Sequence, residues 1–373
     1  MDKKNKVLGL EINEIDEKKK KGLANRLIVA AILILTGVPA YVLGGWIWFA
    51  FILFFLVIAV YEILTASQKK YHWTIWVFTY ILVISYVYWF LIKYNTQSLI
   101  RYQDAKAAGV EIEPWTFSLM DHFDGIYVSI YAIILSIAFY CLCAIVNKEF
   151  DWFDACYLFA MALLIGIGFQ SLLFVRYYPF ALVYQDSLAA ISGKATHYPD
   201  YAEKVASGYF ASPTFKYWGS IVFFTYVLVI TVLNDTFAYF TGMLFGKHKM
   251  NERISPNKTW EGFFGGWILS GIGGMGFAMI CDICGYPLLP SMAIFSANSG
   301  WYWVLIMSFT TPLLGVLGDF TFSMIKRHYG FKDFSHILGA HGGVLDRADS
   351  LIFTYAFAAV FAIFTSTGWR FWA

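Results

Sequence analysis

Nine apolar runs of roughly 20 residues divide this chain. An α-helix needs about 20 apolar residues to cross a hydrocarbon core of about 30 Å, so each run is long enough to span a membrane. The composition agrees, since only 14% of the residues are charged, against about 25% in a soluble domain. We therefore predict an all-α, polytopic integral membrane protein with about nine transmembrane helices. The runs cover residues 27–43, 46–64, 73–92, 126–146, 155–175, 218–240, 263–283, 301–320 and 351–367.

The distribution of Lys and Arg predicts the orientation. If the amino terminus is cytoplasmic, 19 of the 27 basic residues fall in cytoplasmic segments, as the positive-inside rule requires. The carboxyl terminus is then extracytoplasmic, and the membrane is either a bacterial plasma membrane or that of a eukaryotic organelle. Three regions are predicted: a cytoplasmic tail (1–26), about five helices with two long extracytoplasmic loops (27–217), and a carboxyl-terminal catalytic region of about four helices with cytoplasmic active-site loops (218–373).

Ionisable residues are almost absent from the first five runs and border or interrupt the last four, which places the chemistry in the carboxyl-terminal half. Asp235 lies inside the sixth run. An ionised side chain within a membrane helix costs about 2.5–3.5 kcal/mol on insertion scales, which favours a functional role over an Asp that merely reaches the interface.

The segment that follows contains Ser255-Pro256-Asn257-Lys258-Thr259 and then Glu261. We expect a helix to start at Ser255 and Pro256, with a cation and a hydroxyl beside outward-pointing backbone N–H groups, an arrangement that suits a phosphate. A simple capped helix start is the alternative. The candidate phosphate-binding residues, which the resemblance described below implies are nucleotide-binding, are Asp235, Ser255, Asn257, Lys258, Thr259 and Glu261.

The richest polar segment lies between the last two runs, from Asp319 to Asp349. If the eighth helix continues, Asp319, Ser323 and Lys326 or Arg327 share one helical face. Carboxylates paired with cations suit phosphoryl-type transfer, where catalysis is mostly positioning and charge neutralisation by Mg²⁺ and Lys or Arg. A salt-bridged connecting loop is the alternative. The candidate catalytic residues are Asp319, Lys326, Arg327, Lys332, Asp333, His341, Asp346 and Arg347, and Asp349 lies close by.

This segment resembles the signature of the CDP-diacylglycerol synthase, or phosphatidate cytidylyltransferase, family. The likeness extends from about residue 225 to the carboxyl terminus and includes the Ser255 to Gly262 segment. Leu338-Gly339-Ala340 departs from the family's usual Leu-Pro-Gly. The signature is met by Ser323, Lys326, Arg327, Lys332, Asp333, His341, Gly342, Gly343, Asp346, Arg347 and Asp349.

The resemblance implies that CTP and phosphatidic acid react to give CDP-diacylglycerol and pyrophosphate, with Mg²⁺ as cofactor. It implies that basic residues neutralise phosphates, that membrane lipids surround the protein and that no nucleic acid binds; it leaves a homodimer open. His341 either contacts a phosphate or fixes its glycine turn. The implied metal ligands are Asp319, Asp333, Asp346 and Asp349.

Three other functions predict sequence features of their own. A CDP-alcohol phosphotransferase is disfavoured because Asp124-Gly125 is not followed by the motif of that class. A CTP-dependent enzyme acting on another lipid, such as an ether lipid or a polyprenol, stays open. A secondary transporter is the least favoured, because its ionisable residues would lie near the bilayer midplane rather than at one end of the helices.

Overall fold

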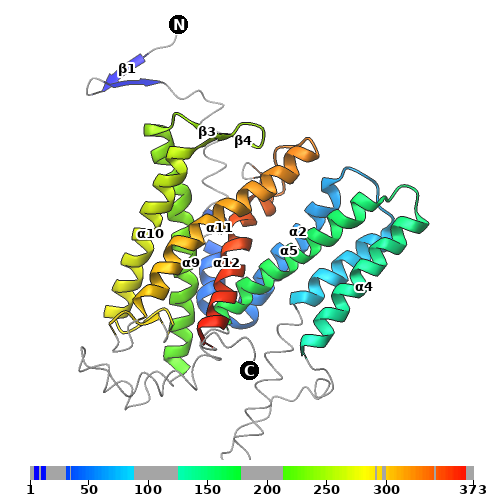
Figure 1. Cartoon of the computed structure of the whole chain (residues 1–373), viewed down its shortest axis with the longest axis horizontal. Helices are drawn as coiled ribbons and strands as arrows, with labels where there is room; N and C mark the ends of the chain where they lie inside the picture. Colours follow the sequence, from blue (N-terminus) through cyan, green and yellow to red (C-terminus); the bar gives the residue numbers. More distant parts are fainter. Residues whose placement is uncertain are drawn as a thin grey trace, which may run out of the picture.

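The structure is a computed structural model that describes residues 4–7, 10–13, 31–33, 35–87, 125–177, 213–289, 292–295, 300–339 and 342–366. Within these residues, each of the nine predicted runs contains a helix (Figure 1). The helices are Ala31–Leu43, α2 (Gly45–Ala66), Trp73–Val87, α4 (Gly125–Val146), α5 (Trp152–Tyr177), α9 (Pro213–Phe245), α10 (Trp260–Ile283), α11 (Trp301–His328) and α12 (Leu345–Ser366).

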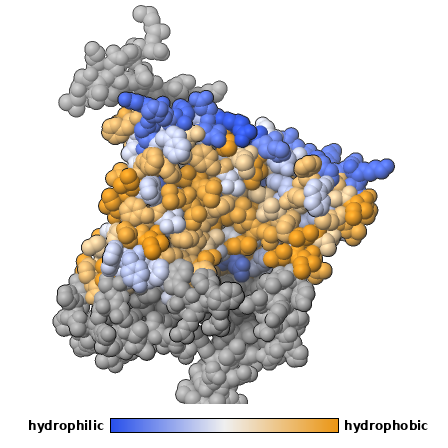
Figure 2. All heavy atoms as spheres, viewed as in Figure 1, coloured by the Kyte–Doolittle hydropathy of each residue, from blue (hydrophilic) through white to orange (hydrophobic). Residues whose placement is uncertain are grey.

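Five helices in the described part of the chain are long and apolar enough to cross a membrane: α2, α5, α9, α10 and α11. Figure 2 shows a broad band of hydrophobic residues below an edge of hydrophilic ones. The prediction of an all-α polytopic membrane protein is confirmed, while the number of crossings stays a prediction.

In the described part of the chain, two short antiparallel hairpins accompany the helices. β1 (Lys4–Val7) pairs with β2 (Leu10–Asn13), and β3 (Lys249–Asn251) pairs with β4 (Ser255–Thr259). The expectation that a helix starts at Ser255 and Pro256 is therefore wrong. The backbone stays extended as far as Thr259, whose hydroxyl accepts a hydrogen bond from the Gly262 N–H and so caps α10. The capping residue thus lies at the end of the motif, and the residues before it form a strand.

The glycines of α10 let it pack closely against α9. A Cβ on Gly266 would lie 2.8 Å from the Ala238 Cβ and 2.9 Å from the Asn234 carbonyl oxygen. Small residues allow membrane helices to approach in this way. Gly318 plays the same part between α11 and α12, because its α-carbon faces the carbonyl oxygen of Asp349.

The loops predicted to be cytoplasmic gather at one edge of the bundle. The Lys69 ammonium contacts Asp151 at 3.1 Å and Asp154 at 2.6 Å, and so joins the loop after α2 to the loop before α5. The backbone N–H of Asp154 and the Lys69 ammonium hold the pKa of Asp151 below its usual value. Figure 1 shows β3, β4 and the end of α11 at this same edge. The structure thus agrees with the prediction that these loops share one side.

Candidate functional site

A cavity of about 440 Å³ opens between α9, the β3–β4 hairpin, α10 and α11. Its polar lining comes from separate parts of the sequence that were predicted to act together. α9 supplies Asp235, β4 supplies Asn257, Lys258 and Thr259, and α11 supplies Asp319. Five of the predicted site residues therefore meet in one cavity at the end of the bundle where the polar loops lie.

Lys258 is the central cation of this cavity. Its ammonium forms an ion pair with Asp319 Oδ2 and lies 4.5 Å from the centre of the Phe320 ring. The Ser323 hydroxyl donates to Asp319 Oδ1 at 3.2 Å, which confirms the predicted shared helical face. Asp235 lies near enough for its charge to interact with Asp319 and Lys258. Because about 30% of the Lys258 and Asp319 side chains is exposed, an incoming ligand can reach both.

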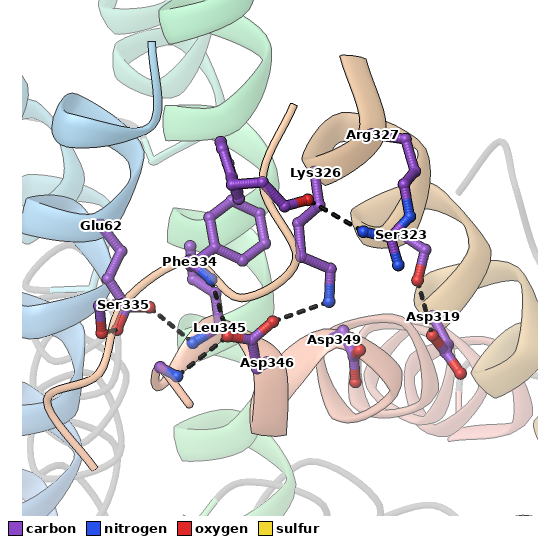
Figure 3. Close-up of polar contacts among 12 residues, drawn as sticks. Glu62, Asp319, Ser323, Lys326, Arg327, Phe334, Ser335, Leu345, Asp346 and Asp349 are labelled. Carbon is purple, nitrogen blue, oxygen red and sulfur yellow. Dashed lines mark hydrogen bonds and ion pairs between the residues drawn. The ribbon is translucent and has the colours of Figure 1, made fainter. Parts of the chain in front are cut away.

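A second, more buried cluster forms around Asp346 at the start of α12 (Figure 3). The Lys326 ammonium contacts Asp346 Oδ1 at 2.7 Å, and the two side chains are only 10% and 4% exposed. Asp346 Oδ2 accepts hydrogen bonds from the backbone N–H groups of Phe334 at 2.8 Å and Gly343 at 2.9 Å. Oδ1 thus ties α12 to Lys326 of α11, and Oδ2 holds the loop that precedes α12.

Gly342 allows Asp333 and Asp346 to approach each other. Its φ of 80° lies in the left-handed region that favours glycine. A Cβ at this position would lie 3.0 Å from Asp346 Oδ2 and 3.5 Å from Asp333 Oδ1. A side chain at residue 342 would therefore occupy the space between the two carboxylates.

Glu62, in α2, completes this cluster from the amino-terminal half, and the sequence analysis missed it. Its side chain is fully buried. Its Oε1 accepts hydrogen bonds from the Ser335 hydroxyl at 2.6 Å and the Val344 N–H at 2.8 Å, and its Oε2 accepts one from the Leu345 N–H at 2.8 Å. The carboxylate thereby binds the first N–H groups of α12, where the helix dipole favours negative charge.

A usable sequence signal for Glu62 existed. It is a single carboxylate inside the apolar run 46–64, and such a residue carries the same functional expectation that was applied to Asp235. The residues that hold the loop before α12 therefore include one from α2, in the amino-terminal half.

Asp349 lies between the two clusters, with Asp346 on one side and Asp319 on the other (Figure 3). Its charge interacts with those of Asp319, Lys326 and Asp235, and its Oδ1 accepts the Ser350 N–H at 2.7 Å. The cavity and the Asp346 cluster are therefore two parts of one electrostatic unit.

The remaining candidates lie around this unit. Arg327 donates to the carbonyl oxygens of Ile254 at 3.3 Å and Phe331 at 3.0 Å, and so fastens the hairpin to the loop after α11. Glu261 accepts from the His248 ring at 2.6 Å and from the backbone N–H groups of residues 247 and 248, which closes the turn before β3. Lys332 is exposed, and Ser255 pairs with Asn251 in the hairpin.

Two further candidates lie elsewhere. Arg347 lines a second, apolar cavity. His341 lies outside the described residues.

Whether Mg²⁺ fits this site depends on which side-chain oxygens can coordinate it. Within the described residues, no three His, Cys, Asp or Glu side chains are grouped so as to hold a metal ion. Mg²⁺ usually binds through one or two carboxylates together with substrate phosphates, and not in a cage made of protein alone. Asp235 and Asp319 offer that arrangement, since both line the cavity where a phosphate would enter. Asp346 is less available, because its side chain is only 4% exposed, against 30% for Asp319, and is enclosed by Lys326 and the backbone N–H groups of Phe334 and Gly343.

The fold and the site together define a polytopic membrane protein with an acidic and lysine-lined cavity at one edge of its helices. The chain belongs to the cytidylyltransferase family, whose model matches residues 24–365. This confirms the family resemblance found in the sequence.

Curated relatives carry the name phosphatidate cytidylyltransferase. The proteins of Staphylococcus epidermidis and Staphylococcus aureus are each 41% identical to this chain, over 128 and 129 residues, or 34% of this chain and 44% of theirs. The protein of Haemophilus influenzae is 37% identical over 139 residues, or 37% of this chain and 45% of its own length. The chain thus spans about half the length of the relatives it matches.

Proposed function

We propose that this protein transfers the cytidylyl group of CTP to phosphatidate, giving CDP-diacylglycerol and pyrophosphate. The observation that carries the proposal is the cavity that gathers Asp235, Lys258 and Asp319 at the edge of a membrane bundle. The family match and the names of the relatives give the reaction class. A phosphate-binding site at the end of apolar helices suits the pairing of a water-soluble nucleotide with a lipid.

In the proposed reaction, a phosphate oxygen of the lipid forms a bond to the α-phosphorus of CTP, and the bond from that phosphorus to the pyrophosphate oxygen breaks. Lys258 would neutralise charge on the triphosphate, and the Asn257 and Thr259 side chains would offer hydrogen bonds within the same cavity. Asp235 and Asp319 would hold Mg²⁺ carried by the nucleotide. When bound, Mg²⁺ would supply positive charge to the phosphate oxygens.

Lys326, Asp346 and Glu62 have a supporting part in this scheme. Their contacts fix the loop before α12 and therefore the position of Asp349 beside the cavity. We further propose that this edge faces the cytoplasm, where CTP is available, with the amino terminus on the same side and the carboxyl terminus on the other. The gathering of the positively charged loops at this edge supports that orientation.

The direct test uses the purified full chain in lipid nanodiscs with α-labelled CTP, Mg²⁺ and phosphatidate. We expect label to enter the lipid and one pyrophosphate to be released for each labelled lipid. Asp319→Asn should lower kcat by about 100- to 1000-fold, the range found when one charge-stabilising group is removed. Asp151→Asn, which removes a carboxylate of the same type on an exposed loop, is the matched control and should leave turnover near the wild-type value.

Parallel reactions with an ether-linked phosphatidate and with polyprenyl phosphate decide the lipid class. Transfer to one of these in preference to diacyl phosphatidate would replace the proposed substrate. An absence of labelled lipid with every acceptor, from protein that is folded and binds CTP, would overturn the proposed reaction.

A further inference from the structure

A second cavity, of about 410 Å³, lies on the opposite side of α12 from the carboxylates. Its walls come from helix Ala31–Leu43, α2, α5, α9 and α12, so most of them belong to the amino-terminal half. Arg347 alone is charged among the described residues that line it, and nearly all the others are apolar. An apolar cavity with one cation at its polar end suits a ligand with a hydrocarbon body and an anionic head.

The first turns of α12 form the partition between the two cavities. Val344, Arg347, Ala348, Leu351 and Tyr355 line the apolar cavity and follow the spacing of one helical face. Asp346 and Asp349 belong to the other face, toward Lys326 and Asp319 (Figure 3). A head group held at Arg347 would therefore lie one residue along the chain from Asp346.

The depth of the apolar cavity matches one leaflet of a bilayer. From Val344, the residue before α12, to Tyr355 the wall advances by eleven residue steps, or roughly 16 Å at 1.5 Å per residue. That is about half of a hydrocarbon core of about 30 Å. The inner end lies where the Tyr355 ring packs against Phe224, with ring centres 4.5 Å apart. A chain entering beside Arg347 would thus reach about the midplane.

We propose that this cavity binds one acyl chain of the phosphatidate substrate, with the lipid phosphate at Arg347. Arg347 at the mouth of the cavity complements an anionic head group, and the cavity is about as deep as one leaflet. Both features favour a lipid with a phosphate head as the ligand. The identity of that lipid rests on the proposed function. The amino-terminal helices then form part of the substrate site as well as an anchor.

The test is a substitution at the inner end of the cavity. Leu172→Trp, in α5, would fill space that a long chain occupies and a six-carbon chain does not reach, because Leu172 lies one turn beyond Gly168, which packs on Ile352 of α12. We expect kcat/KM for dioleoyl phosphatidate to fall about tenfold or more, the effect of overpacking a filled site, and kcat/KM for dihexanoyl phosphatidate to change little. The ratio of the two values is the readout, because a general loss of folding or of CTP binding lowers both equally.

Leu269→Trp, at a position on α10 that is 40% exposed and lines neither cavity, is the matched control and should keep the wild-type ratio. An unchanged ratio in Leu172→Trp would overturn the proposal. If that variant fails to fold, a phosphatidate with a photoreactive group in mid-chain is used on the wild-type protein without CTP. Crosslinks in the helices that line the cavity, α2 and α12 among them, that excess dioleoyl phosphatidate removes would support the site, and crosslinks confined to helices that do not line it, such as α4, α10 and α11, would overturn it. Because this measurement needs no turnover, it is judged separately from the proposed reaction.

Discussion

Lys326 and Asp346 are both buried, and an ion pair in such a place has an ambiguous energetic role. Taking two charges out of water costs several kcal/mol each, and their attraction offsets this only when the remaining hydrogen-bonding capacity is also used. Asp346 meets that condition through the N–H groups of Phe334 and Gly343. The pair therefore fixes the loop before α12 in one arrangement, and its charges lie beside Asp349.

A double-mutant cycle separates the structural role of this pair from its chemical role. Lys326→Met alone leaves a buried carboxylate without its cation and should destabilise the protein by about 3–5 kcal/mol. Adding Asp346→Asn removes the uncompensated charge, so thermal stability in detergent should largely recover. We expect cytidylyl transfer to stay at least about 100-fold below the wild-type rate in the double variant, because the charges beside the cavity are gone. A double variant with wild-type turnover would show that the pair acts only on folding.

Glu62 makes a second prediction at this scale. The Glu62 carboxylate accepts hydrogen bonds from the backbone N–H groups of Val344 and Leu345. Glu62→Gln replaces one carboxylate oxygen with an NH₂ group, which cannot accept such a bond. Each buried N–H left without an acceptor costs about 1–3 kcal/mol. We expect a lower melting temperature and a lower kcat. Glu149→Gln, which makes the same change on an exposed loop, is the control and should alter neither quantity. A Glu62→Gln variant as stable and as active as wild type would show that the loop does not depend on this carboxylate.

At the scale of single elements, the helices were predictable from the sequence. The thickness of the bilayer sets the length of a membrane helix, and an apolar run of that length can be recognised from neighbouring residues alone. The face shared by Asp319 and Ser323 was also predictable, since it requires only that α11 continue beyond the membrane to His328. The start of α10 was not, because Ser255 is as good a capping residue as Thr259, and the β3–β4 hairpin, in which Ser255 pairs with Asn251, decides between them. The contact of Glu62 with the start of α12 joins residues far apart in the sequence, which local patterns do not specify.

The α9–α10 contact gives a prediction for one element. Gly266→Ala would place a methyl group 2.8 Å from Ala238 Cβ and should destabilise the protein by about 1–3 kcal/mol, as overpacking does. Gly276→Ala, on the same helix, meets no atom within 4 Å and should be neutral or stabilising by up to about 1 kcal/mol, the gain in helix propensity. Thermal unfolding of both variants in the same detergent is the measurement. Equal stability of the two would mean that α10 does not pack on α9 through Gly266.

For the whole molecule, the amino-terminal helices do more than hold the protein in the membrane. They supply Glu62 to the loop before α12 and most of the wall of the apolar cavity. The predicted division at residue 217 therefore separates regions that share contacts at the site. A site assembled at one edge of the bundle requires that edge to face the compartment that contains the nucleotide.

The orientation of the bundle can be measured with residues at its two edges. Cys284 is exposed at the end of α10 that is remote from the cavity, and Glu149 is exposed in the loop before α5, at the edge of the cavity. In variants that retain Cys284 alone, or carry Glu149→Cys alone, we expect a membrane-impermeant maleimide to label Cys284 from outside the cell. The cysteine at residue 149 should react only after the membrane is permeabilised, so that the reagent reaches the cytoplasmic side. Labelling of both positions from one side would contradict the single polar edge in the structure. The reverse pattern would place the cavity away from cellular CTP, and the proposed reaction would then lack its nucleotide.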